Sequence, residues 1–321
     1  MRGHGTTTRL PQSVLRPMLA TLVDAPFDDA AWVFETKWDG FRVVAHVDHG
    51  VVTLRSRNGN DVTEAYPRVT AALARIRHHA VLDGELVALD RQGRSRFQLL
   101  QEARKSGARL RYCVFDLMYL DGRDLRRLPL VERKDRLRHI LPGTALVRYS
   151  RHVKRHGIRA FRAAQRRGLE GIMAKRAEGR YYSERRTREW LKIKAANEQE
   201  TVIIGFTRPR RSRQFFGALA LAVRQGPSWH YVGHTGTGFN AESLQAIHTR
   251  LVKLTTARKP VAGKIPNERT TTWVRPRLVA EIKFTEWTRD GRMRHPVFLG
   301  LRTDKAASQV VRERPRRASR L

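Results

Sequence analysis

The stretch Glu35-Thr36-Lys37-Trp38-Asp39-Gly40-Phe41-Arg42 contains one lysine, followed by a carboxylate two residues later and an arginine five residues later. A lysine with an ordinary pKa of about 10.4 is almost fully protonated at neutral pH and is then a poor nucleophile. Desolvation and nearby cations can lower that pKa and expose the amine. The same residues also suit a β-hairpin with solvated charges. The stretch alone does not decide between these two interpretations.

The residues around this stretch predict a domain of strands and helices. Alternating apolar residues from Phe41 to Val47 predict a strand, Asp48-His49-Gly50 a turn, and residues 51–55 a returning strand. Thr63 is expected to cap a helix that has Pro67 in its first turn. Further strands and one more helix are expected at 86–89, 112–119 and 158–167. Because strands and helices do not alternate strictly, the pattern favours an α+β domain with a mainly antiparallel sheet.

The pattern changes after Asn197 to short strands separated by Gly-rich turns such as 233–238. Strands are expected at 201–206, 218–223, 230–232 and 278–285, and a helix at 241–254. About five short strands with one helix fit a small closed barrel of the OB-fold type. The expected organisation is a flexible N-terminal tail, an α+β domain, an OB-fold domain and a basic C-terminal tail, at 1–16, 17–196, 197–306 and 307–321.

The charge of the chain is strongly unbalanced. Lysine and arginine number 64 against 30 acidic residues, a formal net charge of +34. Such an excess is stabilised by a polyanion, and arginine suits the phosphates of a nucleic acid because its fork can bind two oxygens. An anionic membrane is the alternative, but the sequence contains no basic amphipathic helix with an aromatic face. A solvated arginine-rich surface is the third interpretation, and it explains only part of the excess.

Other features bear on location and redox chemistry. No apolar run approaches 18 residues, so no membrane span is predicted. The first residues, MRGHGTTTRL, lack the apolar core of a signal peptide, which predicts a cytoplasmic, nucleoid-associated protein. The single cysteine, Cys113, lies in an apolar run and is expected to be a buried small hydrophobe.

Six further blocks follow Lys37 in a definite order. They are Ser56-Arg57-Asn58-Gly59, Leu82-Asp83-Gly84-Glu85, Phe115-Asp116, Glu170-Gly171-Ile172-Met173-Ala174-Lys175, Trp190-Leu191-Lys192-Ile193-Lys194 and Arg302-Thr303-Asp304-Lys305. Each block alone is ordinary, since alternating lysines also suit any half-exposed strand and an apolar-flanked Phe is most simply core. Together, in this order, they resemble the covalent nucleotidyltransferases, the superfamily of ATP-dependent DNA ligases and mRNA-capping guanylyltransferases.

The second half of the chain is similar to one branch of that superfamily. Residues 205–206, 216–219, 231–239 and above all 284–302 look like the ligase module of the bacterial Ku-associated end-joining DNA ligases. The similarity extends over about residues 17–305, and within these 321 residues no polymerase or phosphoesterase domain is expected. The resemblance implies an α+β fold of two domains, an antiparallel-sheet nucleotidyltransferase (ATP-grasp-like ligase) domain followed by an OB-fold β-barrel.

The resemblance also implies roles for individual residues. Lys37 would attack the α-phosphorus of ATP and expel pyrophosphate, while Asp39 would help to position nick ends and metal. Lys192 and Lys194 would stabilise charge on the α-phosphate. Contacts with ATP are implied for Glu35, Thr36, Arg42, Arg57, Glu85, Phe115, Lys175, Arg302 and Lys305, with Phe115 stacking on adenine and the last two approaching the pyrophosphate. Mg²⁺, or Mn²⁺, would be held at Glu85 and Glu170.

These implications predict an ATP-dependent DNA ligase that seals nicks or breaks through lysyl-AMP and adenylated DNA, in repair or non-homologous end joining. Expected partners are DNA, a Ku homologue and a separate repair polymerase, with the chain itself a monomer. One alternative is an RNA-capping or RNA-joining enzyme, which would prefer GTP or RNA ends. The other is a non-catalytic nucleic-acid-binding module, which is disfavoured by four intact residues, Lys37, Glu85, Glu170 and Lys192. Nick sealing and break joining are not distinguished by the sequence, nor is the preferred metal.

Overall fold

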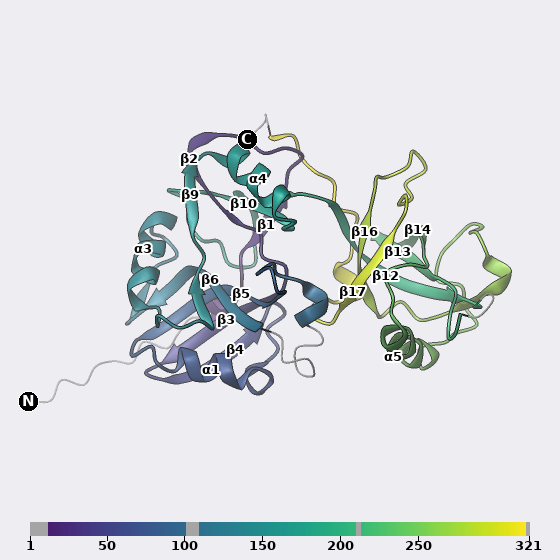
Figure 1. Ribbon diagram of the computed structural model, residues 1–321, viewed down its shortest axis with the longest axis horizontal. Helices are drawn as coiled ribbons and strands as arrows, with labels where there is room; N and C mark the ends of the chain where they lie inside the picture. Colours follow the sequence, from purple (N-terminus) through teal and green to yellow (C-terminus); the bar gives the residue numbers. More distant parts are fainter. Residues whose placement is uncertain (1–11, 101–108, 210–212, 319–321) are drawn as a thin grey trace, which may run out of the picture. The chain divides into compact units, whose positions relative to one another are not determined.

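The computed structural model describes residues 12–100, 109–209 and 213–318 (Figure 1). The chain divides into two compact units, the first comprising Met1–Ala195 with Pro315–Leu321 and the second Ala196–Arg314. Both units consist mainly of antiparallel strands with a few helices. The α+β class predicted from the sequence is therefore confirmed.

The first sheet of unit 1 is built around the strand that precedes Lys37. Its strand order is β1 (Leu19–Leu22), β11 (Arg186–Lys194), β10 (Gly171–Arg176), β2 (Asp29–Thr36) and β9 (His152–Arg155). Pairing is antiparallel except between β1 and β11. Helix α4 (Gly157–Arg166) lies next to β10 and β2, and its Ala164 packs on Phe34 and Ile193 (Figure 1). One face of this sheet is thus covered by α4.

The second sheet of unit 1 contains the expected hairpin. Its order is β4 (Val51–Ser56), β3 (Phe41–Asp48), β5 (His79–Leu89), β6 (Arg109–Leu120) and β7 (Arg123–Asp124), with β8 (Val147–Tyr149) beside β6. Helices α1 (Pro67–Leu73) and α3 (Leu130–Ile140) contact this sheet. Alternation in β3 and β4 predicted this hairpin, which is confirmed; β4 buries every second residue, whereas β3 buries residues on both of its faces.

The predicted cap of α1 is wrong. A short 3₁₀ turn, Thr63–Ala65, precedes the helix, whose N-cap is Tyr66 and whose first residue is Pro67. The Thr63 hydroxyl instead accepts a hydrogen bond from the Leu54 backbone at 2.9 Å. Proline begins the helix without a capping side chain because its φ is already helical and it has no N–H to satisfy.

The uncovered face of the first sheet and one face of the second share a hydrophobic cluster. Val44, Val81 and Phe115 come from β3, β5 and β6, and Trp190 comes from β11. This cluster joins the two sheets into one unit. Residues in the same strands, one or two positions further on, form the site described below.

Unit 2 is a closed barrel. Its strand order is β14 (Ser228–Thr235), β13 (Leu219–Gln225), β12 (Asn197–Thr207), β16 (Val279–Phe284) and β17 (Val297–Arg302), with β15 (Thr271–Trp273) beside β12. The first and last strands of this order, β14 and β17, meet where Phe298 of β17 donates its N–H to the carbonyl of Thr237, two residues after β14, at 3.0 Å. Gly238 (φ +92°) follows directly, and a Cβ there would overlap the Phe298 carbonyl. Glycine therefore permits the closure.

Helix α5 (Ala241–Val252) of unit 2 begins at a capping box formed by Asn240 and Ser243. Ile247 and Leu251 of this helix lie in the core of the barrel unit. Five main strands and this helix make up the OB-type fold, as predicted. Strand β17 was not anticipated as a separate strand.

Both terminal segments differ from the tails that the sequence suggested, as far as they are described. Val14, in the 3₁₀ turn Gln12–Leu15, is fully buried in unit 1, and Val310 is fully buried in unit 2. Arg316 donates its N–H to the Leu22 carbonyl at 3.0 Å and accepts one from Asp24 at 3.1 Å. These are backbone bonds, which a polar and basic sequence does not indicate. Within the described residues, no helix combines the length and apolarity that crossing a membrane requires.

Candidate active site

Lys37 directly follows β2 and lies beside the start of β10. Its backbone N–H donates to the Gly171 carbonyl at 3.0 Å. Its amine forms an ion pair with Glu170, and both side chains are largely buried. The antiparallel register of β2 and β10 brings these two residues together, although they are 133 positions apart in the chain.

Lys192 and Lys194 lie on the same face of the sheet as this ion pair. Lys194 is opposite Gly171, and Lys192 is opposite Met173, which in turn is opposite Glu35. Residues directly opposite in neighbouring strands share a face, whereas Leu191 and Ile193 point to the face that α4 covers. Both lysines are half-buried and interact with other groups. Strand β11 and the residue that follows β2 therefore present three lysine amines, Lys37 included, to one surface.

Glu35, two residues before Lys37, lies in a buried ionic network. Its carboxylate is 2.8 Å from the Lys134 amine and 3.2 Å from the Lys175 amine, and it accepts a hydrogen bond from the Ser150 hydroxyl at 3.1 Å. Burial opposes the charge of Glu35, but the two lysines outweigh it and lower its pKa. The residue is 3% exposed. The prediction that Glu35 contacts ATP is therefore not supported by this conformation, because lysines occupy its oxygens.

Lys175 has the complementary environment. Burial lowers its pKa to about 8, although Glu35 favours the charged form. Its amine lies 4.2 Å from the ring centroids of both Phe115 and Trp190. Like Glu35, this residue is closed off from solvent, and its predicted ATP contact requires a rearrangement that the structure does not contain.

Arg42 forms a fork with Asp83. Nε and Nη2 donate to the two carboxylate oxygens, each at 2.6 Å, and the Tyr181 hydroxyl donates to the same carboxylate at 2.6 Å. Burial disfavours the charge of Arg42, but Asp83 raises its pKa beyond the ordinary value. Asp83 already accepts hydrogen bonds from Nε and Nη2 of Arg42. In this conformation these two nitrogens are therefore not available to a phosphate.

Phe115 was predicted to stack on adenine, and its surroundings argue against that role. The residue is 7% exposed, and its ring contacts the Arg42 guanidinium at 4.6 Å and the Lys175 amine at 4.2 Å. An edge-to-face contact with Trp190, at 5.9 Å between centroids, completes its environment. In this conformation two cations and Trp190 therefore contact the ring, and its stacking on adenine stays a prediction.

The remaining predicted residues of unit 1 lie around this surface. Glu85 is opposite Arg42 in β5, and Thr36 ends β2. Arg57 is half-buried in the turn after β4. Asp39 accepts a hydrogen bond from the Phe97 N–H at 3.0 Å, so one of its oxygens holds the segment that follows β5.

Arg302 and Lys305 belong to unit 2. Arg302 donates to both oxygens of Asp304, at 2.8 and 2.7 Å, and approaches Glu281 at 3.3 Å. Lys305 forms an ion pair with Glu200. Both cations are thus satisfied by acids of their own unit, and their predicted approach to pyrophosphate stays a prediction.

Sequence reasoning missed the buried cations of α3. Arg133 makes a two-point ion pair with Asp116 at 2.8 and 2.9 Å, and Lys134 reaches Glu35. With Leu130 and Leu137 they occupy positions i, i+3, i+4 and i+7, the pattern of a buried helix face. Two cations at apolar-face positions are the signal that indicates buried partners.

The predicted metal ligands are compatible with a hard cation. Glu170 and Glu85 offer carboxylate oxygens, the donors that Mg²⁺ prefers, and Mg²⁺ is usually held by one or two carboxylates together with substrate phosphates and water. The described residues contain no group of three or more His, Cys, Asp or Glu side chains arranged to hold an ion. The donor set thus fits a metal that shares its ligands with phosphates, and not a closed protein cage.

Comparisons with known proteins match both units. The family model described as ATP dependent DNA ligase domain matches residues 17–194, and the one described as ATP dependent DNA ligase C terminal region matches residues 212–305. The multifunctional non-homologous end joining protein LigD of Pseudomonas aeruginosa is 39% identical over 97% of this chain and 38% of its own length. The corresponding LigD of Mycobacterium tuberculosis is 38% identical, over 93% and 40%. The chain spans about two fifths of the length of these curated relatives.

The solved structure of mycobacterial DNA ligase D complexed with ATP and MES is similar over 95% of this chain and 100% of that one. The sequences are 37% identical and the TM-score is 0.73. A likeness at this level extends to the fold of both units.

Proposed function

The chain belongs to the ATP-dependent DNA ligase family, and on that premise we propose that it joins a 5′-phosphate to a 3′-hydroxyl in DNA at the expense of ATP. The observation that carries this proposal is the Lys37–Glu170 ion pair on a face shared with Lys192 and Lys194. A nucleophilic amine, a carboxylate and two further amines at one surface suit attack on a phosphate.

In the first step, the deprotonated amine of Lys37 attacks the α-phosphorus of ATP. A P–N bond forms, the P–O bond to the β-phosphate breaks, and pyrophosphate leaves with the electron pair. Glu170 holds the ammonium before reaction and is placed to accept its proton. Lys192 and Lys194 would stabilise negative charge on the phosphoryl oxygens.

In the second step Lys37 is the leaving group. In the third step it takes no part in making or breaking bonds. A 5′-phosphate oxygen of the DNA attacks the phosphorus of lysyl-AMP, so the P–N bond breaks and Lys37 recovers its proton. The 3′-hydroxyl then attacks the 5′-phosphorus, a phosphodiester forms, and AMP leaves. Such chemistry depends mainly on positioning and on charge stabilisation.

Glu85 and Glu170 would hold Mg²⁺ or Mn²⁺ together with the phosphates of ATP. The ion would supply positive charge against the phosphate oxygens. The buried networks of Glu35 and Arg42 serve a different purpose, since they fix β2, β10 and β3 around Lys37.

The test is covalent labelling with ATP that carries a label in its α-phosphate. Wild-type protein should form an acid-labile adduct on a denaturing gel, and Lys37→Ala should form none, because the described neighbours of Lys37 offer no amine at the same position. Lys105→Ala, which changes a lysine elsewhere in the chain, is the control and should keep the adduct. An adduct at wild-type level in Lys37→Ala would overturn the proposal, and preferential labelling by GTP would favour a capping enzyme.

The biological setting is a finer part of the proposal. The names of the relatives refer to non-homologous end joining, so we place this chain in DNA break repair, in the cytoplasm at the nucleoid, with a Ku homologue as partner. A Ku homologue added to the protein should stimulate joining of linear duplexes more than sealing of nicks. Equal rates with and without it would argue for nick sealing as the main activity.

A further inference from the structure

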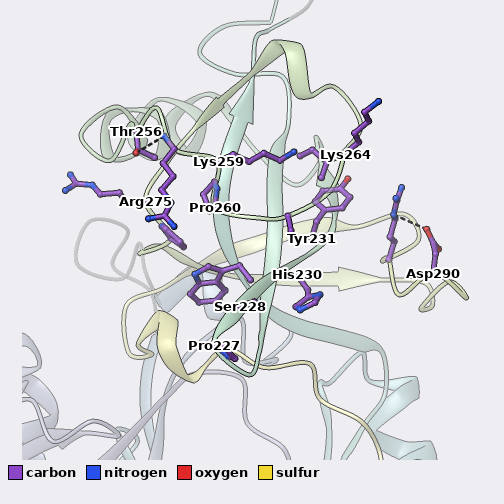
Figure 2. Close-up of a pocket in the computed structure, with 16 residues that line it drawn as sticks. Pro227, Ser228, His230, Tyr231, Thr256, Lys259, Pro260, Lys264, Arg275 and Asp290 are labelled. Atoms are coloured by element: carbon purple, nitrogen blue, oxygen red, sulfur yellow. Dashed lines mark hydrogen bonds and ion pairs between the residues drawn. The ribbon is translucent and has the colours of Figure 1, made fainter.

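A groove of about 760 Å³ lies in unit 2, against β14 of the barrel (Figure 2). Its walls are β14 with the preceding turn (227–231), the segment after α5 (256–265), residues 275–276, and residues 290 and 292 before β17. The volume lies within the range of about 300–1,000 Å³ of sites that enclose small ligands. None of the residues assigned above to adenylation lines it.

The groove is strongly cationic. Five of its lining residues are Arg258, Lys259, Lys264, Arg275 and Arg292, whereas Asp290 is its one acidic residue. Lys259 is paired with Glu268 and Arg292 with Asp290. Among the described residues, Arg258, Lys264 and Arg275 take part in no ion pair, although Glu268 also interacts electrostatically with Lys264, and the groove keeps an excess of cations.

Two aromatic side chains, Trp229 and Tyr231, line the same groove. Trp229 is held in place because its backbone bridges Val261, and its side chain packs on the cluster beneath the groove. Tyr231 is fixed by its hydroxyl, which lies 2.5 Å from Nδ1 of His234. The Arg292 guanidinium is 5.4 Å from the Tyr231 ring centroid. Figure 2 shows Tyr231 and His230 to the right and Arg275 to the left, with Lys259 between Arg275 and Tyr231.

We propose that this groove binds a short single-stranded segment of nucleic acid. Arg258, Lys264 and Arg275 would contact its phosphates, and bases would lie against Trp229 and Tyr231. Grooves that bind single strands combine cations that follow the backbone with aromatic rings on which bases stack. A duplex keeps its bases stacked inside, so it can satisfy the cations but not the rings.

The inference does not rest on ligation chemistry, because the groove and Lys37 lie in different units. If the proposed function holds, the bound segment would be the single-stranded end of a broken duplex.

The experiment measures binding of a short fluorescein-labelled oligothymidylate by anisotropy, with an oligouridylate and a blunt duplex as the other arms. Arg258→Glu/Lys264→Glu reverses two exposed cations of the groove, and Arg250→Glu/Lys283→Glu reverses an exposed arginine and lysine of the same unit outside it. The groove variant should lose about tenfold or more in oligothymidylate affinity relative to this matched control. Both variants should weaken duplex binding equally, because they share one net charge.

The oligouridylate arm distinguishes DNA from RNA as the source of the strand. Photocrosslinking of an oligonucleotide that contains 5-iodouracil should give adducts at Trp229 or Tyr231. Equal losses of oligothymidylate affinity in the two variants, or crosslinks only outside the groove, would overturn the proposal. Lysyl-AMP formation is measured in the same samples and should be unchanged in both variants. If the wild-type protein forms no lysyl-AMP, the proposed ligase function is rejected. The oligothymidylate measurements on the groove remain valid in that case.

Discussion

Glu35, close to Lys37 in the sequence and in the sheet, pairs with the buried amines of Lys134 and Lys175. Its negative charge offsets the free-energy cost of burying these two cations. Glu35→Gln keeps the shape of the side chain but leaves Lys134 and Lys175 without a buried carboxylate. Removal of one member of such a network typically destabilises a protein by about 3–5 kcal/mol. We expect a loss of this size in the free energy of unfolding, measured by urea denaturation. Glu64→Gln, at an exposed position, is the control, and a change below about 1 kcal/mol at Glu35 would contradict the assignment.

Lys175 predicts a pH dependence of stability. Its pKa is lowered to about 8 in the folded protein, mainly by burial, from an ordinary value near 10.5. Between these two pH values the unfolded chain binds more protons than the folded one, so this group makes stability rise with pH from about 8 to about 10.5. The rise should amount to at most about 3 kcal/mol.

Urea denaturation at several pH values, compared with Lys175→Met, tests this expectation. The variant lacks the titrating amine but leaves Glu35 paired with Lys134. Its stability should therefore rise less than that of the wild type across this range. Parallel curves for the two proteins would show that Lys175 does not titrate there.

The contact between β10 and β11 depends on Gly171. Its φ of +149° is unfavourable for other residues, and a Cβ would overlap the Ile193 carbonyl of the neighbouring strand. Gly171 also accepts the Lys37 N–H and lies opposite Lys194. A shift of β10 at this position would thus separate the two lysines and displace Glu170.

We expect Gly171→Ala to cost more than about 2 kcal/mol in the free energy of unfolding, because backbone strain and overlap add. Formation of the lysyl-AMP adduct should fall with it. Gly143→Ala is the matched control, since no atom lies within 4 Å of its added Cβ. A Gly171→Ala protein with normal stability and a normal adduct level would show that this register is not required.

The charge of the whole chain predicts how it binds DNA. With a net charge of +34, affinity for a nicked duplex should fall log-linearly with salt, by about −0.9 per phosphate neutralised. A slope of about −5 or steeper is expected for a protein with so large an excess of cations. The affinity should change little with the sequence around the nick, because phosphate contacts do not read bases.

Filter binding or anisotropy at several salt concentrations measures this slope. A slope near zero between low and physiological salt would mean that the arginines form only a solvated surface. The proposal of ligase activity would then rest on the site and the family alone.

The amino-acid sequence determined the features that depend on local spacing and on composition. Alternation predicted the β3–β4 hairpin, short strands with glycine turns predicted the barrel, and ordered charged blocks predicted the chemistry around Lys37. Such signals are local, because each arises from residues within one strand, turn or helix.

Burial and register were decided only by the tertiary structure. The sequence could not tell that Glu35 and Lys175 form a closed ionic network with Lys134, nor that Phe115 is covered by cations. It also could not tell that the chain returns near its C-terminus to pair beside Val23. These contacts depend on which strands and helices become neighbours in the fold. That arrangement is determined by interactions between residues more than a hundred positions apart in the chain, such as Glu35 and Lys175.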